Sequence, residues 1–520
     1  MSYRIGIDVG GTNTDAVILD EDLRVVAAVK TPTSPDGGSG VEAAIAAVIE
    51  RSGIDPQQVH FAMLGTTHCT NAIVERRNLG RVGIIRLGLP ATTAVPPLEG
   101  WPEELCASIE PQVFVLDGGF EVDGRTIRPV NGEQIMQACA QMRGLVDAVA
   151  VVGVFSPMDR SQEDEVAEIV ASELGVPVSR SADIGSIGLL ERENATVLNA
   201  ALIRTLGGMV DGFRAALMQH GITAPVYLGQ NDGTLMTLEY ALSYPVFTIG
   251  CGPTNSIRGA AHLSGLKDAI VVDIGGTTTD IGLLVNGFPR QSSQAAEIGG
   301  IRTNFRMPDV LSVGLGGGTM VHEFDGRVKL GPQSVGYRIG TESLVFGGSI
   351  LTVTDIAAAT GRFNTENAQH VELDAVFLSK AETAILEMLE DSVDRMKSNS
   401  AAVPAILVGG GSIVAPESLA GISEIVRPEF FGAANAVGSA LGDVSGTFER
   451  IYTLSMVPRD QALADAREQA VARAIAAGAL PENVELLEIE EIPLAYLAEA
   501  SVLIRAKAAG PLARTRVLQP

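Results

Sequence analysis

Short apolar runs, separated by polar and glycine-containing turns, dominate the first part of the chain. Their length and alternation predict strands at 4–9, 15–20 and 24–30, followed by a helix at about 40–52. The same pattern predicts strands at 59–64, 81–86, 113–116, 147–154 and 176–178, and helices at about 70–78, 132–143 and 161–174. Strands that alternate with helices in this way are typical of an α/β fold.

The alternation begins again after a stretch that predicts a long connecting helix at about 190–217. The elements predicted beyond it are strands at 225–228, 246–249, 269–274, 280–285 and 405–408, a helix of small residues near 432–442, an Ala-rich helix at 459–478, and strands at 484–492 and 501–507. The last three predict a small α+β C-terminal extension.

One eight-residue motif occurs twice. Asp8-Val-Gly-Gly-Thr-Asn-Thr-Asp15 and Asp273-Ile-Gly-Gly-Thr-Thr-Thr-Asp280 agree at Asp, Gly, Gly, Thr, Thr and Asp, and they lie 265 residues apart. An apolar run precedes each copy and another follows it. The repeat therefore predicts two related domains, each built around a strand–turn–strand unit.

The repeated turn has the composition of a phosphate-binding loop. Its glycines allow close approach of a ligand to consecutive backbone N–H groups, and its leading carboxylate can hold Mg²⁺ directly or through water. The phosphate-binding candidates are Gly10, Gly11, Thr12, Asn13, Thr14, Gly275, Gly276, Thr277 and Thr278, and the metal-binding and catalytic candidates are Asp8 and Asp273. A plain hairpin turn is the alternative for a single copy, but two copies favour a clamp around one nucleotide.

The order of the remaining motifs resembles the actin-like ATPase superfamily, which includes sugar kinases. Small-residue helices at 191–202 and 432–442 suit an interdomain hinge, and Gly409-Gly-Gly411 follows an apolar strand. The resemblance implies two RNase H-like (actin-like ATPase) domains facing a nucleotide cleft. It also implies ATP and Mg²⁺ as cofactors, with Gly409, Gly410 and Gly411 near the adenine or ribose.

Within that superfamily the chain resembles the hydantoinase A/5-oxoprolinase family. Besides the two repeated motifs, the resemblance is carried by Leu64-Gly-Thr-Thr-His-Cys-Thr-Asn-Ala-Ile-Val-Glu-Arg76, by the segment 191–199, by Met307-Pro-Asp-Val-Leu-Ser-Val-Gly-Leu-Gly-Gly-Gly-Thr319 and by 351–355. It implies an ATP-dependent hydrolase subunit that phosphorylates the amide oxygen of a cyclic amide, such as a hydantoin, 5-oxoproline or a lactam. A second subunit of the B type and an oligomeric assembly are further implications.

This interpretation predicts three domains and leaves two alternative functions open. The expected ranges are 1–190 and 191–455 for the actin-like domains and 456–520 for the extension. A small-molecule kinase that releases a phosphorylated product is one alternative function. An ATP-driven conformational activator or chaperone-like ATPase is another, although the tail of about 60 residues is small for a separate substrate-binding domain.

Charge and composition limit the partners. The formal net charge of −25 and the absence of basic runs argue against nucleic acid or an anionic membrane as a partner. The four cysteines form no CxxC pair, the first residues lead directly into a strand, and no apolar run approaches the roughly 18 residues of a membrane span. We therefore expect a cytoplasmic protein without disulfides.

Five further residues have two interpretations each. His68 is either a substrate contact or part of a helix N-terminus, and His322 has no second histidine at metal-binding spacing. Asp309 and Asp355 are either cleft residues or caps and turn residues, with the second interpretation favoured. Cys251 has no histidine at readable spacing, so structural packing is favoured over nucleophilic catalysis.

Overall fold

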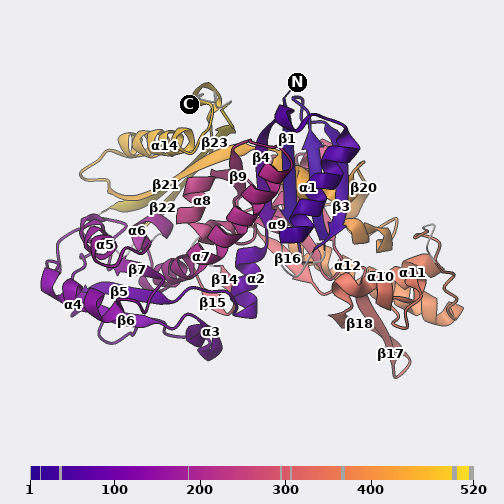
Figure 1. The fold of residues 1–520 in the computed structure, drawn as a ribbon, viewed down its shortest axis with the longest axis horizontal. Coiled ribbons are helices and arrows are strands. Elements are labelled where there is room, and N and C mark those ends of the chain that lie inside the picture. Colours follow the sequence, from indigo (N-terminus) through magenta and orange to yellow (C-terminus); the bar gives the residue numbers. More distant parts are fainter. Residues whose placement is uncertain are drawn as a thin grey trace.

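The protein has a mixed α/β fold, and its two largest sheets each combine parallel and antiparallel strands (Figure 1). In the computed structural model the described residues are 2–11, 13–33, 38–185, 187–292, 296–304, 307–364, 369–494 and 500–513. Within these residues, the order and bounds of most elements agree with the alternation in the sequence.

The largest sheet runs through the centre of the molecule. Its order among the described residues is β22-β23-β21-β10-β9-β4-β1-β2-β3. The strands at one end are β1 (Tyr3–Val9), β2 (Asn13–Leu19), β3 (Val25–Pro32), β4 (Val59–Thr66), β9 (Val226–Gly229) and β10 (Leu235–Thr237). β1 pairs with β2 antiparallel and with β4 parallel, and β4 pairs with β9 parallel. The C-terminal ends of β1, β4 and β9 therefore meet at one edge of the sheet.

A second sheet repeats this local arrangement. Its order is β13-β12-β11-β19-β20, and β16 also pairs with β12. The bounds are β11 (Ala269–Ile274), β12 (Thr279–Val285), β13 (Phe288–Pro289), β16 (Val310–Val313), β19 (Val403–Val408) and β20 (Ile422–Val426). β11 pairs with β12 antiparallel and with β19 parallel, as β1 does with β2 and β4. The sequence repeat is thus also a repeat of strand pairing.

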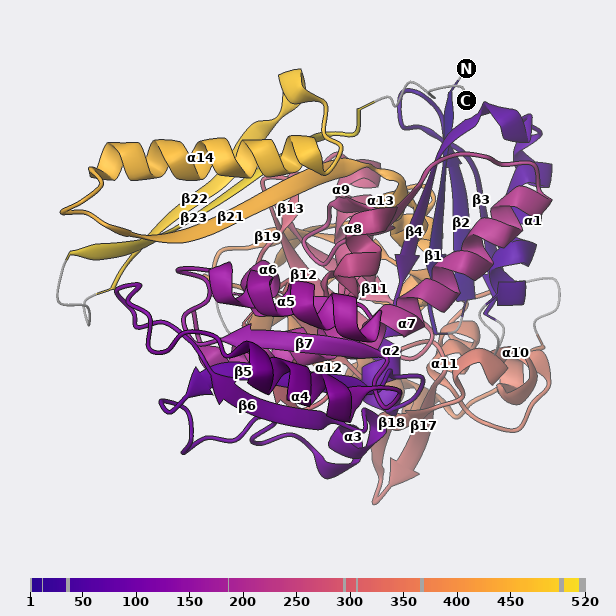
Figure 2. The same cartoon turned by 60° about the vertical axis from the view of Figure 1, so that its left-hand side comes forward.

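A third, all-parallel sheet is inserted between β4 and β9. Its order is β6-β5-β7-β8, and its elements are β5 (Val82–Leu89), β6 (Gln112–Asp117), β7 (Ala148–Gly153), β8 (Val178–Arg180), α3 (Glu103–Ser108), α4 (Gly132–Met142), α5 (Ser161–Leu174) and α6 (Ser181–Ile184). The long helix α7 (Leu189–Gln219) packs on β7 and also on α1 (Gly38–Ser52) (Figure 2). This helix is the connection predicted at about 190–217.

The C-terminal elements extend the first sheet. β21 (Asp443–Thr453) pairs along its whole length with β23 (Ser501–Pro511), which also pairs with β22 (Glu485–Pro493). Helix α14 (Arg459–Ala476) lies along β21 and β23 (Figure 1). It buries a stripe of alanines against them. The first sheet therefore draws strands from all three expected sequence ranges, and division into folding units at 190 and 455 stays a prediction.

A capping residue determines where one of the remaining helices begins. Helix α12 (Ala375–Met396) starts after Asp374, whose Oδ1 accepts hydrogen bonds from the backbone N–H groups of Val376 and Phe377. The other elements are α2 (His68–Glu75), α8 (Leu238–Ser243), α9 (Cys251–Ser264), α10 (Ile339–Glu342), α11 (Val353–Ala359), α13 (Ala434–Ala440), β14 (Glu297–Ile298), β15 (Ile301–Arg302), β17 (Thr319–Phe324) and β18 (Arg327–Ser334).

One predicted strand is wrong. Residues 246–248 belong to a short 3-10 helix, Pro245–Thr248, and Ile249 follows it in a turn, so this segment is not a strand. Pro245 fixes the first turn of that helix, and the ring of Phe247 packs against Tyr244. The apolar run is therefore buried by side-chain packing without joining a sheet. Helix α9, which begins three residues later, was not predicted.

Candidate functional site

The two copies of the repeated motif form the same hydrogen-bonded turn. The N–H of Gly10 donates to the carbonyl of Asn13 at 3.0 Å, and the N–H of Gly275 donates to that of Thr278 at 2.9 Å. In both copies the first and last carboxylates face each other across the hairpin, because Asp8 pairs with Asp15 and Asp273 with Asp280 in the strand register. The turns share this closing hydrogen bond and the same strand register.

The turn residues divide into exposed and buried members. Gly11, Thr277 and Thr278 are exposed, and a Cβ on Gly11 would meet no atom within 4 Å, so ligand access to this part of the turns is open. Gly10, Asn13, Gly275 and Gly276 are partly exposed, whereas Thr12 lies outside the described residues. Thr14 is fully buried, with its hydroxyl 3.2 Å from that of Thr33.

Two glycine runs hold the second turn from both sides. A Cβ on Gly409 would lie 2.2 Å from Oδ1 of Asp273, and a Cβ on Gly411 would lie 2.5 Å from the carbonyl of Gly275. On the other side, the N–H groups of Gly317 and Gly318 donate to the carbonyls of Gly275 and Gly276 at 3.0 and 2.7 Å. Side chains at Gly409, Gly411 and Gly318 would meet this turn, so these glycines allow the loops to touch.

The leading carboxylates of the two turns lie within electrostatic reach of each other. Burial raises the pKa of Asp8 to about 7, with the charge of Asp15 adding to the rise and nearby Asn255 and Asn435 opposing it. Burial, followed by Asp280, raises the pKa of Asp273 to about 6. The charge of Asp273 contributes to the raised pKa of Asp8. The structure therefore brings the two candidate metal ligands to one place.

Helix α9 lies between the two leading carboxylates. Asn255 lies beside Asp8, and the next residue, Ser256, lies beside Asp273, so one helical turn faces both motifs. Sequence reasoning did not single out either residue. The available signal was the Gly-Pro at 252–253, which is typical of a helix start.

Helices α9 and α13 cross at very short range. A Cβ on Gly259 would lie 1.9 Å from the carbonyl of Ala434, and a Cβ on Gly438 would lie 1.8 Å from the carbonyl of Asn255. The small residues of 432–442 thus allow close packing of α13, as their spacing suggested, and its partner is α9. This contact fixes Asn255 beside Asp8.

Lys30 on β3 is a second residue that the sequence did not reveal. Its Nζ lies 2.6 Å from Oδ1 of Asp15, and its charge also lowers the pKa of Asp273. A Cβ on Gly410 would lie 4.0 Å from Lys30 Cε. Lys30 therefore stands between both turns and the Gly409–Gly411 run.

The other residues singled out from the sequence have structural roles or none in this site. Asp355 and Thr352 form the capping box of α11, which confirms the favoured interpretation. Asp309 forms an ion pair with Arg290. Cys251 is buried with a pKa raised to about 12 by that burial, which agrees with structural packing. In the described part of the chain, no three or more His, Cys, Asp or Glu residues are grouped so that they could hold a metal ion. His322 is therefore not part of such a group.

Comparison with known families decides the relationship. Residues 4–174 match the hydantoinase/oxoprolinase N-terminal region, and residues 192–376 match the hydantoinase/oxoprolinase model. The chain belongs to the hydantoinase/oxoprolinase family. Both repeated motifs lie within the matched residues, so the turns described above are part of the region that this family shares.

Two curated relatives give the scale of the similarity. The caprolactamase subunit alpha of Pseudomonas jessenii is 28% identical over 388 residues, which cover 69% of this chain and 54% of that protein. The acetophenone carboxylase gamma subunit of Aromatoleum aromaticum is 27% identical over 422 residues, covering 74% and 56%. The chain therefore spans little more than half the length of these relatives.

A solved structure has the same fold. The ATP-dependent caprolactamase from Pseudomonas jessenii superposes with a TM-score of 0.74 at 20% identity, covering 99% of this chain and 88% of that one. At this identity the similarity concerns the fold. In the described residues of the present chain, no helix is both long enough and apolar enough to traverse a lipid bilayer.

Proposed function

We propose that the two sheets are RNase H-like lobes facing one nucleotide cleft. The strand order β3-β2-β1-β4-β9 in the first sheet corresponds to β16-β12-β11-β19-β20 in the second. In each, an antiparallel hairpin carries the glycine turn and parallel strands follow. The matching hydrogen bonds of Gly10 and Gly275 support the proposal, because one phosphate-binding geometry then serves both lobes.

The residues of the cleft fit Mg²⁺ and a nucleotide. Oδ1 of Asp8 is buried and has no hydrogen-bond partner among the described residues, which suits a carboxylate oxygen that receives a hydrated cation. Asp8 and Asp273 would hold the metal. The turn residues would hold the phosphates: Gly10, Gly11, Thr12, Asn13, Gly275, Gly276, Thr277 and Thr278 by their backbone N–H groups and side chains, with Thr14 supporting the first turn.

We further propose an ATP-dependent hydrolase activity on a cyclic amide of the hydantoin, 5-oxoproline or lactam type. Bound Mg·ATP would supply the phosphoryl group that activates the amide oxygen and so weakens the resonance that protects the ring bond. The observation that carries this proposal is the pair of matched turns in a chain of the hydantoinase/oxoprolinase family. The description of the related caprolactamase as ATP-dependent supports it.

The chain's own residues would bind the nucleotide, orient the carboxylate of Asp8 and neutralise the phosphate charge. Lys30 would place a positive charge between the two turns, where negative charge gathers during phosphoryl transfer. Gly409, Gly410 and Gly411, which pack against the second turn, would lie near the adenine or ribose. Asn255 would orient the carboxylate of Asp8 from its position on α9.

The proposal includes an assembly and a location. The relatives are named as alpha and gamma subunits, which supports a partner, and we propose a B-type subunit in an oligomer located in the cytoplasm. The ranges 1–190 and 191–455 would act as the two lobes and 456–520 as the extension.

A coupled ATPase assay across hydantoins, 5-oxoproline and lactams tests this function, with mass analysis of the products. Ring-opened acid together with ADP and phosphate is the expected result. A stable phosphorylated product would instead identify a small-molecule kinase. Substrate-independent turnover with nucleotide-dependent partner binding would identify a conformational ATPase. The assay is run with the chain alone and with a co-expressed B-type subunit.

A further inference from the structure

A cavity of about 780 Å³ lies where three parts of the molecule meet. Its wall includes Asp183 from the inserted-sheet region, Tyr240 from α8 and Lys507 from the C-terminal strands. None of the described residues that line it belongs to the repeated turns or to the Gly409–Gly411 run. The cavity is therefore separate from the proposed phosphate loops.

One wall of the cavity is aromatic. The rings of Tyr240 and Phe247 are nearly parallel, at an angle of 9° with centroids 6.3 Å apart, and the Tyr244 ring lies 4.7 Å from that of Tyr240. All three rings line the cavity, and 39% of the Tyr240 surface is exposed. A flat apolar group can stack on such a wall, and aromatic contacts of this kind add to simple burial.

The cavity lining carries charged groups of both signs. It contains five cations, Arg160, Arg450, Arg473, Arg505 and Lys507, and four carboxylates, Asp183, Asp232, Glu449 and Glu488. Asp164 and Asp465, which pair with Arg160 and Arg450, lie just outside this lining. A cation in the lining is therefore available to an anionic ligand only where it has no carboxylate partner of its own.

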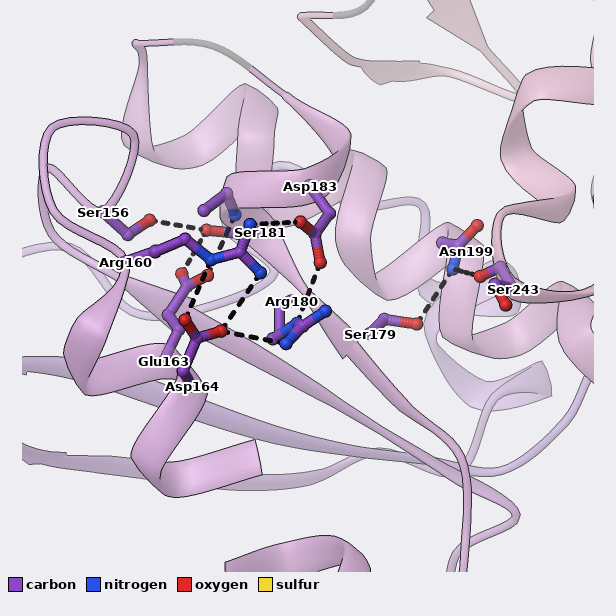
Figure 3. A network of polar contacts seen from close by, with 11 residues as sticks. Ser156, Arg160, Glu163, Asp164, Ser179, Arg180, Ser181, Asp183, Asn199 and Ser243 are labelled. Carbon is purple, nitrogen blue, oxygen red and sulfur yellow. Dashed lines mark hydrogen bonds and ion pairs between the residues drawn. The ribbon is translucent and has the colours of Figure 1, made fainter. Parts of the chain in front are cut away.

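Most of these cations already have carboxylate partners. Figure 3 shows Arg160 bound to Asp164 and Asp183, at 2.9 and 3.0 Å. Lys507 lies 2.8 Å from Asp232. Burial acts to raise the pKa of Asp232, but Lys507 and Thr234 outweigh it, so the pKa lies below its ordinary value. The other pairs are Arg450 with Asp465 and Arg505 with Glu449.

Arg473 differs from the other four cations. Among the described residues it forms no ion pair: its Nη1 donates to the carbonyl of Thr447 at 2.7 Å, and its guanidinium lies over the ring of Phe448. Its charge is close enough to lower the pKa of Tyr240 against the larger effect of burial. Gln291 also lines the cavity, and its Nε2 is buried and has no hydrogen-bond partner in the described structure.

We propose that this cavity binds a small N-acyl amino acid. The carboxylate would pair with Arg473, the amide carbonyl would accept a hydrogen bond from Gln291, and the flat acyl group would stack on Tyr240. A bidentate contact between a guanidinium and a carboxylate is among the strongest available to a small anion. The site does not depend on ATP chemistry, because a linear N-acyl amino acid has no ring to open.

Isothermal titration calorimetry with hippurate (N-benzoylglycine) tests the site in the full chain without nucleotide. Hippurate is expected to bind, whereas uncharged N-benzoylglycinamide should bind at least about tenfold more weakly, because it loses the charge-assisted hydrogen bonds. Equal binding of the two compounds, or no heat with hippurate, would overturn the proposal. A parallel titration with Mg·ATP reports on the phosphate loops separately.

Two variants of α14 form a matched pair for this test. Arg473→Gln should weaken hippurate binding about tenfold or more, while Arg467→Gln, an exposed position on the same helix that does not line the cavity, should leave it unchanged. Gln291→Glu places a carboxylate beside the ligand and should also weaken binding. Wild-type affinity in both Arg473→Gln and Gln291→Glu would rule out this site for the bound hippurate.

Discussion

Nζ of Lys30 lies 2.6 Å from Oδ1 of Asp15, and this pair joins the third strand of the first sheet to the end of the first glycine turn. Asp15 is buried, while Lys30 remains 38% exposed and reaches toward Asp273 and Gly410. The lysine therefore neutralises one buried carboxylate and still offers positive charge to the cleft. This double role makes Lys30 the most informative position for mutagenesis outside the repeated motif.

Replacement of Lys30 by Gln should weaken Mg·ATP binding by about tenfold or more, because a charge-assisted contact to phosphate is lost. It should also lower the free energy of unfolding by roughly 1–3 kcal/mol, since Asp15 is left unpaired in a buried position. Nucleotide titration and chemical denaturation measure the two effects. Lys267→Gln, at an exposed lysine far along the chain, is the control, and Lys30→Arg should retain most binding. Unchanged nucleotide affinity in Lys30→Gln would remove the residue from the cleft chemistry.

Nucleotide turnover should depend on both leading carboxylates. Asp273→Asn is expected to abolish ATP turnover while the melting temperature and circular dichroism spectrum stay close to those of the wild type. The amide keeps the size of the side chain but cannot neutralise a cation. An unchanged rate in this variant would exclude Asp273 from the mechanism.

Binding of Mg·ATP should strengthen as the pH rises from about 5.5 to 8. The pKa of Asp8 is raised to about 7 and that of Asp273 to about 6, so both must lose protons before they can hold a cation. Calorimetry near pH 6 in buffers of different ionisation enthalpy should detect proton release on binding. Affinity that stays flat across this range would contradict the assignment of these carboxylates as metal ligands.

The same pKa shift predicts the pH dependence of stability without nucleotide. Because the pKa of Asp8 in the folded protein lies above its ordinary value of 3.8, its stabilising contribution is complete below about pH 4 and is lost as the pH rises through about 7. Relative to the wild type, Asp8→Asn should therefore be more stable at pH 8 than at pH 5. Melting temperatures at both values measure this, with the exposed Asp211→Asn as a variant expected to show no such trend.

Gly438→Ala should destabilise the protein by about 1–3 kcal/mol or more, because its Cβ would lie 1.8 Å from the carbonyl of Asn255 and force α9 and α13 apart. The displacement should also reduce turnover, since Asn255 lies beside Asp8. Gly207→Ala in α7 meets no atom within 4 Å and should instead gain about 0.5–1 kcal/mol. Denaturant unfolding of both variants tests the contrast, and equal stabilities would contradict close packing at Gly438.

The inserted sheet is joined to α7 by a fully buried ion pair. Arg86 donates to Glu193 through Nε at 2.7 Å and Nη2 at 2.6 Å, and neither side chain is exposed. Arg86→Met should cost about 3–5 kcal/mol because it strands a buried carboxylate, whereas the double replacement Arg86→Met with Glu193→Met should recover much of this loss. A double variant that is less stable than either single variant would contradict this account.

Several features follow from the sequence alone. The positions of most strands and helices could be predicted because alternation and run length are local properties, and the repeated Asp-Gly-Gly-Thr motif indicated that two hairpins share one backbone geometry. The matching hydrogen bonds at Gly10 and Gly275 are the structural form of that repeat. The prediction of a strand at 246–249 was wrong because a short apolar run alone does not distinguish a segment that pairs in a sheet from one that packs through its side chains.

Only the tertiary structure decided which distant residues share a site. Lys30 meets Gly410 across 380 positions of sequence, and Asn255 and Ser256 reach Asp8 and Asp273 because α9 is clamped against α13 through glycines. The C-terminal strands join the first sheet through β21 and β10, a pairing that no local pattern specifies. The sequence therefore determined the loops, whose conformation depends on neighbouring residues, while burial and strand pairing between remote segments determined what surrounds them.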